Sequence, residues 1–202
     1  MTAIERGMPG ARKLRTTMAA EGLPRLALTV DDVYKMAEAG ILSEDDRVEL
    51  IEGELVPMSP KGNHHEVLKA QLNIFFARHA PKGVMFVPET TFRLSEITYL
   101  EPDFVFYKEE QPLADLRGDN ALLVVEVSDT SLAYDRGRKA RLYASFGIRE
   151  LWVIDAVKLT TWVYRDPGNG FASATMEKTK DEPLEALLIP GLGVTLGALT
   201  LR

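Results

Sequence analysis

The feature that most constrains the fold is a pair of apolar segments separated by a helical one. Residues 122–128, LLVVEVS, predict a buried strand, and residues 150–156, ELWVIDA, predict a second one. Residues 132–147 between them predict a helix that ends at Gly147. A strand–helix–strand crossover usually places its two strands parallel to each other, so we expect a mixed sheet flanked by helices.

The rest of the sequence adds elements on both sides of this crossover. Thr29 and Asp32 predict the start of a short helix that ends at Gly40, and residues 47–58 alternate around a Glu-Gly turn, as in a β-hairpin. A helix is expected over 64–80, with one apolar stripe made of Val67, Leu68, Leu72, Phe75 and Phe76. Strands are expected within 83–94, over 98–107 and in a hairpin over 150–165.

These elements predict an α/β protein with a mixed sheet and the core order α-β-β-β-α-β, extended by an N-terminal helix and β-hairpin. We expect residues 1–24 to be a disordered arm and residues 25–202 to form a single domain. The absence of cysteine excludes disulfides and thiolate metal sites. No apolar run approaches the roughly 18 residues that cross a membrane, and we expect a cytoplasmic protein with no membrane partner.

Charge is unevenly distributed along the chain. The formal net charge is −6, which argues mildly against tight, non-specific binding to nucleic acid. Residues 131–150, however, carry five basic side chains against two acidic ones. The positive charge is therefore concentrated beside the buried strand, and we expect Arg136, Arg138 and Arg141 to supply phosphate contacts.

Two carboxylates and a lysine stand out against this background. Alternation along 98–107 places Asp103 on the face opposite Phe104 and Phe106, and Glu126 lies within the apolar strand. A carboxylate in such a strand is costly unless it is paired or binds a metal. Two carboxylates on adjacent strands can bind Mg²⁺ or Mn²⁺, and Lys139 lies on the inner face of the following helix, in line with Asp135 and Tyr143.

Each of these residues also has a purely structural interpretation. Glu126 can be an ion-pair partner of Lys139 without any metal, and Asp103 can be a turn residue after Pro102. Lys139 can be a solvated member of a basic stretch. The motif HEVLK at His65 lacks the second histidine of a zinc HExxH site, so His65 can be a helix-start or surface residue.

Several segments taken together resemble a known family. The PD of EPDFVFY, followed about twenty residues later by EVS, is similar to the PD-(D/E)XK nuclease superfamily, which shares the core order α-β-β-β-α-β. More closely, ELIEGELVPMSP…HH, EPDFVFY, LVVEVSDTS…YDRGRKARLYASFGIRELWVID and IPGLG resemble the Uma-two family of restriction-endonuclease-like proteins. The resemblance covers roughly residues 25–200.

The resemblance implies roles for particular residues. Asp103 and Glu126 match the two metal-binding acids, and the backbone carbonyl of Val127 is the implied third protein ligand. The superfamily lysine is expected two residues after the second acid, where this chain has Ser128, and the narrower family places it on the crossover helix at Lys139. Glu54 and His65 lie in the family's N-terminal block and are implied to line the same cleft, and Ser128 is a further supporting residue. Asp135 and Tyr143 are expected to hold Lys139 in place, because the three side chains share one helical face.

Two functional hypotheses follow. The first is a metal-dependent endonuclease that uses Mg²⁺ or Mn²⁺ and water to hydrolyse phosphodiester bonds in nucleic acid, with DNA as the expected substrate and a homodimer as the expected assembly. The second is a non-catalytic binding or assembly module that keeps the nuclease fold. Binding of a divalent metal at the two carboxylates separates them.

Overall fold

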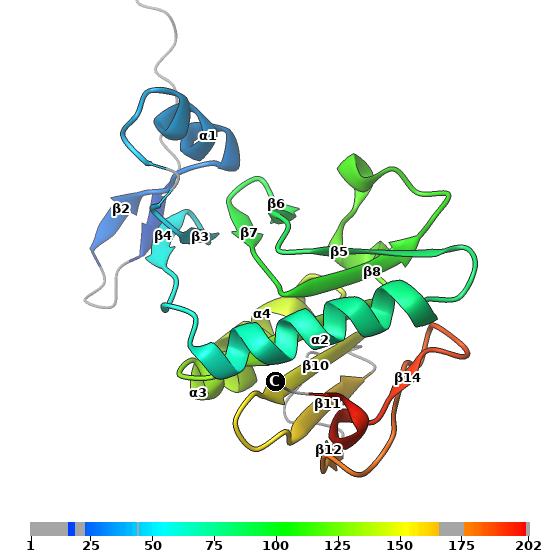
Figure 1. Ribbon diagram of the computed structural model, residues 1–202. Coiled ribbons are helices and arrows are strands. Elements are labelled where there is room, and N and C mark those ends of the chain that lie inside the picture. The colour runs from blue at the N-terminus through cyan, green and yellow to red at the C-terminus, as the bar shows by residue number, and fades with distance from the viewer. Residues whose placement is uncertain (1–15, 19–22, 44, 166–175, 201–202) are drawn as a thin grey trace, which may run out of the picture.

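A six-stranded mixed sheet forms the centre of the molecule (Figure 1). The computed structural model describes residues 16–18, 23–43, 45–165 and 176–200. The strand order is β12-β11-β10-β9-β8-β5, and β9 and β10 are parallel while the other neighbours are antiparallel. The strands are β5 (Val84–Pro88), β8 (Phe104–Lys108), β9 (Leu123–Ser128), β10 (Glu150–Asp155), β11 (Thr161–Arg165) and β12 (Met176–Lys178). The predicted parallel pair and hairpin are confirmed.

Helix α2 (Asn63–His79) covers one face of this sheet, as Figure 1 shows. Its buried side chains Leu68, Leu72 and Phe76 pack on the sheet, and the Phe76 ring lies 5.2 Å from Phe104 and 4.9 Å from Phe106, centroid to centroid, both edge to face. Val67 was expected in this stripe but is only partly buried, and His65 takes that end of it instead. The helix thereby brings an imidazole to the edge of the sheet.

The crossover connection covers the opposite face. It consists of α3 (Leu132–Tyr134), a π-helical turn η3 (Asp135–Lys139) and α4 (Ala140–Ser145), and Gly147 follows it with φ +82°. The sequence predicted a regular α-helix, but the Ala140 N–H donates to the carbonyl of Asp135, five residues back. The wider turn keeps both Asp135 and Lys139 buried.

A second, four-stranded sheet lies beside the first, with the order β4-β3-β7-β6. Its strands are β3 (Val48–Ile51), β4 (Glu54–Pro57), β6 (Phe92–Ser95) and β7 (Thr98–Leu100). The prediction of one strand over 98–107 is therefore wrong, because β7 and β8 belong to different sheets and Pro102, which cannot donate a ladder hydrogen bond, lies between them. The side chains on both faces of β8 are buried, one set in the core cluster with the crossover helix and the other in the core cluster with α2.

The elements of the large sheet follow the predicted order, α2, β5, β8, β9, α3–α4 and β10, with the β6–β7 hairpin inserted into the smaller sheet. The short helix predicted from Thr29 and Asp32 is confirmed as α1 (Val30–Glu38), and these two residues form a capping box at its start. Strands β1 (Thr16–Met18) and β2 (Pro24–Leu26) pair with each other, and the rest of the arm predicted over 1–24 lies largely outside the described residues.

Short elements complete the described chain. The 3₁₀ turns η1 (Leu113–Asp115) and η2 (Gly118–Asn120) link β8 to β9. Near the C-terminus, β13 (Leu184–Glu185) pairs with β14 (Gly193–Val194), and η4 (Leu196–Ala198) follows. Ile189, Leu192 and Leu196 of this C-terminal segment join the core under α2. In the described part of the chain, no helix combines the length and apolarity needed to cross a bilayer.

The β3–β4 turn makes a close contact that admits only glycine. Gly53 has φ +87°, and a Cβ atom there would lie 2.5 Å from the Cβ of Ala27 and 2.8 Å from its Cα. Its N–H donates to Ile97 and its carbonyl accepts from Leu28, so the turn fastens the hairpin to two other segments.

Replacing Gly53 with alanine is expected to lower the free energy of unfolding by about 2–4 kcal/mol, from left-handed strain plus the clash. Gly83→Ala is the matched control, because Gly83 has φ +85° but a Cβ atom added there would meet nothing within 4 Å. It should cost only about 1–2 kcal/mol. Urea unfolding of both variants measures the difference, and equal losses would contradict the proposed contact.

Candidate active site

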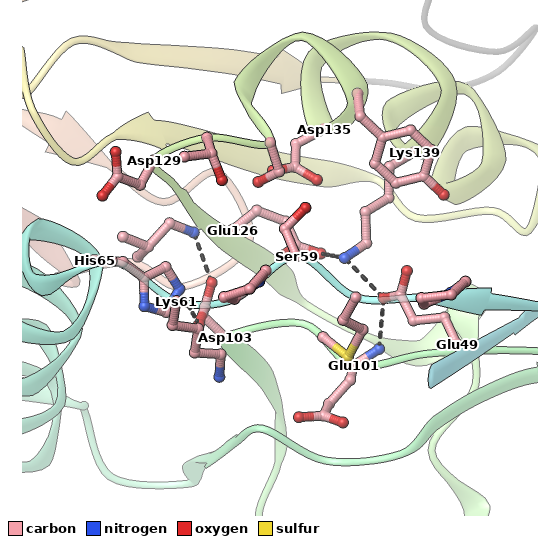
Figure 2. Close-up of a pocket in the computed structure, with 18 of the residues that line it drawn as sticks. Glu49, Ser59, Lys61, His65, Glu101, Asp103, Glu126, Asp129, Asp135 and Lys139 are labelled. Carbon is pink, nitrogen blue, oxygen red and sulfur yellow. Dashed lines mark hydrogen bonds and ion pairs between the residues drawn. The ribbon is translucent and has the colours of Figure 1, made fainter. Parts of the chain in front are cut away.

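A cavity of about 420 Å³ lies where the two sheets, α2 and the crossover helix meet (Figure 2). Six parts of the chain contribute to it: β3, the segment 56–62, the start of α2, the segment before β8, the end of β9 with the turn that follows, and the crossover helix. Six carboxylates and two lysines are among the described residues that line it: Glu49, Glu101, Asp103, Glu126, Asp129, Asp135, Lys61 and Lys139. The cavity is thus strongly acidic.

Two contacts fix the side chain of Asp103 beside the end of β9 in the large sheet. Its Oδ2 accepts a hydrogen bond of 2.8 Å from the Val127 N–H, and its Oδ1 lies 2.9 Å from Nε2 of His65. The expectation that Asp103 lies within one alternating strand over 98–107 is wrong, because β7 ends at Leu100 and β8 begins at Phe104. Asp103 instead bridges β9 and α2, and His65 joins the site as the resemblance implied.

Pro102 changes the hydrogen bonding available to the backbone of Val127. Phe104 pairs with Val125, so continuing this register by two residues places Val127 opposite Pro102. The N–H and C=O of one strand residue point toward the same neighbour, and proline has no N–H to donate to that carbonyl. The Val127 carbonyl therefore faces the Asp103 side without the ladder donor that another residue at position 102 would offer.

Glu126 and Lys139 meet in the interior. Lys139 Nζ lies 2.9 Å from Oε1 of Glu126, and the Tyr143 hydroxyl donates to the same Oε1 at 2.5 Å. Both side chains of the ion pair are at most 6% exposed. Among the described residues, no hydrogen bond or ion pair engages Oε2 of Glu126, so the partners of this carboxylate are concentrated on one oxygen.

Glu49 is a member of the site that the sequence analysis did not identify. Its Oε1 lies 2.8 Å from Lys139 Nζ and accepts a 3.0 Å hydrogen bond from the Glu101 N–H. Figure 2 shows the Lys139 side chain extending between Glu126 and Glu49. Glu54, the hairpin acid that was implied instead, lies on β4 and is not among the described residues that line the cavity.

Burial and charge set the protonation of this cluster. Burial, opposed by the charge of Lys139 and reinforced by the carboxylates of Asp135, Asp103 and Glu49, raises the pKa of Glu126 to about 8. Burial alone would lower the pKa of Lys139, but Glu126 and Glu49 outweigh it and raise that pKa well above its ordinary value. Lys139 therefore stays a cation, and the cluster retains an excess of negative charge that a proton or a metal ion can offset.

Asp135 is placed differently from the prediction that it holds Lys139. Its Oδ2 accepts hydrogen bonds from Ser128 at 2.7 Å and from Ser131 at 2.5 Å. Burial is the main reason that the pKa of Asp135 is raised. Ser128, which stands where the superfamily lysine is expected, thus anchors the start of the crossover helix to the end of β9.

The segment 58–62, between β4 and α2, forms another wall of the cavity. Lys61 pairs with Glu89, which also lies 3.0 Å from Lys69 of α2. A Cβ atom at Gly62 would lie 2.1 Å from Oδ2 of Asp129, so the loop passes close to the β9 end of the cavity. Lysines at this wall place positive charge beside the acidic interior.

The predicted phosphate-binding arginines lie elsewhere. Arg136, Arg138 and Arg141 are exposed on the crossover helix and are not among the described lining residues. The Arg136 guanidinium lies 3.7 Å from the centre of the Trp162 ring, a cation–π contact on β11. Their role in binding nucleic acid stays a prediction.

The donor set suits a hard divalent cation. Among the described residues, no three acidic or histidine side chains form a complete metal-binding group. Mg²⁺ nevertheless needs only one or two carboxylates when water and phosphate complete its coordination. Asp103 and Glu126 would hold such an ion, with the Val127 carbonyl as a third oxygen donor, and the surplus of carboxylates in the cavity matches its charge.

Removing the buried cation should expose how the cluster is balanced. Lys139→Met leaves Glu49 and Glu126 buried without their shared partner, and the free energy of unfolding is expected to fall by about 3–5 kcal/mol. Adding Glu49→Gln to that variant should restore part of the loss. Lys82→Met, at an exposed position, is the control. Unchanged stability of Lys139→Met in urea unfolding would show that these ion pairs do not stabilise the fold.

Comparisons with known proteins identify a family and a shared fold. A family model, Uma2, described as "Putative restriction endonuclease", matches residues 30–199. A crystal structure described as a "putative nuclease belonging to DUF820" from Anabaena variabilis ATCC 29413 has a TM-score of 0.64 at 15% identity, covering 84% of this chain and 96% of that one, which shows a shared fold. No curated protein matches the sequence. Because the family model spans most of the chain, the protein belongs to the Uma2 family.

Proposed function

We propose that the protein is a metal-dependent endonuclease that hydrolyses phosphodiester bonds in DNA. The observation that carries the proposal is the convergence of Asp103, Glu126 and Lys139 on one cavity, from three separate segments of the chain. A family described as restriction endonucleases supports the same reaction class. The cytoplasmic location and the homodimeric assembly expected from the sequence stay predictions.

The carboxylates would act as metal ligands. A Mg²⁺ or Mn²⁺ ion, when bound, would supply Lewis-acid charge at the phosphoryl group. His65 and the Val127 N–H restrain the two oxygens of Asp103, and Tyr143 restrains Glu126. The ligands are therefore oriented before any ion binds, which lowers the entropic cost of binding.

Lys139 would act as a cationic hydrogen-bond donor rather than as a base. Its pKa is raised well above the ordinary value by Glu126 and Glu49, against the effect of burial, so it keeps its proton at neutral pH. An ammonium group has three protons, and two of them face Glu126 and Glu49. The third can hold an anionic oxygen of the substrate or the attacking water, which is the contribution expected from a positioned cation.

Nicking of supercoiled plasmid DNA tests the proposal. The pure protein should nick plasmid in Mn²⁺ or Mg²⁺ but not in EDTA. Glu126→Gln, which keeps the shape of the side chain but removes its charge, should lower the rate by at least about 100-fold, the scale of losing one electrostatic group in a catalytic site. Glu110→Gln, at an exposed turn, should leave the rate unchanged.

Nicking that survives in Glu126→Gln would exclude this site as the catalytic centre. No cleavage with any metal, on plasmid, RNA or branched substrates, would favour the alternative of a non-catalytic binding module with the same fold.

Metal binding can be measured without activity. Mn²⁺ that binds only the native state should raise the melting temperature, by an amount equivalent to about 2.7 kcal/mol when its concentration is 100 times Kd. Asp103→Asn and Glu126→Gln should each remove most of that shift. A shift that persists in both variants would place the metal elsewhere.

A further inference from the structure

A second cavity has the opposite electrostatic character to the first. It has a volume of about 470 Å³ and lies between α1, the start of β6 and the η1 turn. Two arginines, two threonines and one tyrosine are among its described lining residues, which include no carboxylate: Tyr34, Thr90, Thr91, Phe92, Arg93, Leu113, Ala114, Leu116 and Arg117. In a chain with a formal net charge of −6, this local composition is selective for an anion.

The two arginines are held in place from different sides. Nη1 of Arg117 donates to the carbonyls of Ala114 at 2.9 Å and Leu116 at 2.7 Å, which fixes its guanidinium at the end of η1. Nη1 of Arg93 lies 3.3 Å from Oδ1 of Asp31, a residue whose side chain is 66% exposed. Guanidinium groups restrained in this way keep further N–H donors for an incoming phosphate.

The aromatic member of the cavity is unusually exposed. Tyr34 retains 49% of its accessible surface. It lies three residues after Asp31 on α1, so the two side chains project from the same face of the helix. That face lies toward β6, because Asp31 pairs with Arg93 of β6. Buried Phe92 and Leu116 form the apolar floor of the cavity. A flat, accessible ring next to fixed cations is the combination on which unpaired bases stack.

The two cavities are neighbours along the chain. The Glu89 N–H donates to the carbonyl of Asp103 at 3.3 Å, and Thr90 and Thr91, which line the second cavity, follow directly. Two residues span at most about 7 Å. A phosphodiester chain that leaves the acidic cavity would therefore meet the basic one within a short distance.

From this arrangement we infer that the cavity between Arg93, Arg117 and Tyr34 binds an unpaired stretch of nucleic acid, with phosphate on the arginines and a base stacked on Tyr34. The inference rests on the proposed nuclease function for the choice of ligand, but the site itself needs neither the metal nor catalysis. A free nucleotide offers the same chemistry as a strand, so the experiment must separate the two.

The test measures the anisotropy of a fluorescein-labelled, ten-residue oligothymidylate in EDTA, so that no metal contributes to binding. Tyr34→Leu should weaken binding roughly tenfold, the scale of losing one stacked base, whereas Tyr34→Phe should bind like the wild type. Arg93→Gln should weaken binding severalfold and reduce the slope of log K against log salt by about 0.7. Arg78→Gln, an exposed change on α2, is the matched control.

Three outcomes would overturn the inference. The first is wild-type affinity in both Tyr34→Leu and Arg93→Gln. The second is an equal loss in Tyr34→Phe and Tyr34→Leu. The third is displacement of the labelled strand by thymidine monophosphate as effectively as by unlabelled strand, which would make the ligand a free nucleotide. Circular dichroism of each variant confirms that the fold is retained.

The two proposals can fail separately. Strand binding that depends on Tyr34 and Arg93, without metal-dependent nicking, would exclude the nuclease and keep this site. Nicking that depends on Glu126, with unchanged strand binding in Tyr34→Leu and Arg93→Gln, would exclude this site and keep the nuclease.

Discussion

The ion pairs of the buried Lys139 ammonium group are the interactions on which the arrangement of the cavity depends. Lys139 contacts Glu126 of the large sheet and Glu49 of the small sheet, while its own backbone belongs to the crossover helix. The two sheets and the crossover helix thus meet at one cation. The charge of Lys139, Glu126 or Glu49 alone would be costly in an apolar interior. These ion pairs link the two sheets at the wall of the cavity.

The sequence was informative where local physical rules decide the outcome. The apolar run LLVVEVS predicted the buried strand that carries Glu126, and the spacing of Asp135, Lys139 and Tyr143 placed all three on one helical face, which is buried. Glu49 was missed because both strands of the hairpin carry acids, and only the docking of β3 against the large sheet decides which of them reaches Lys139. The break at Pro102 was missed because the apolar pattern continues through it, although the two halves join different sheets.

Charge is sorted between two neighbouring cavities rather than spread over the surface. Six carboxylates are among the described residues that line the first cavity, and two arginines are among those that line the second, beyond the Glu89–Thr91 connection. A chain with a negative net charge therefore has a region of local positive charge outside its acidic cavity. Exposed arginines on the crossover helix, including Arg136 stacked on Trp162, add positive charge on another part of the surface.

The π-helical turn at Asp135–Lys139 rotates the side chains before it relative to the side chains after it, compared with a continuous α-helix. A π turn accommodates about one residue more than an α-helical turn, and each α-helical residue rotates the chain by about 100°. A chain one residue shorter at this point would keep Tyr143 against Glu126 but rotate Asp135 away from Ser128. The extra residue therefore acts as a spacer between two hydrogen-bonded clusters. A one-residue gap at this place in a relative's sequence would mark a protein with the same fold and a differently connected site.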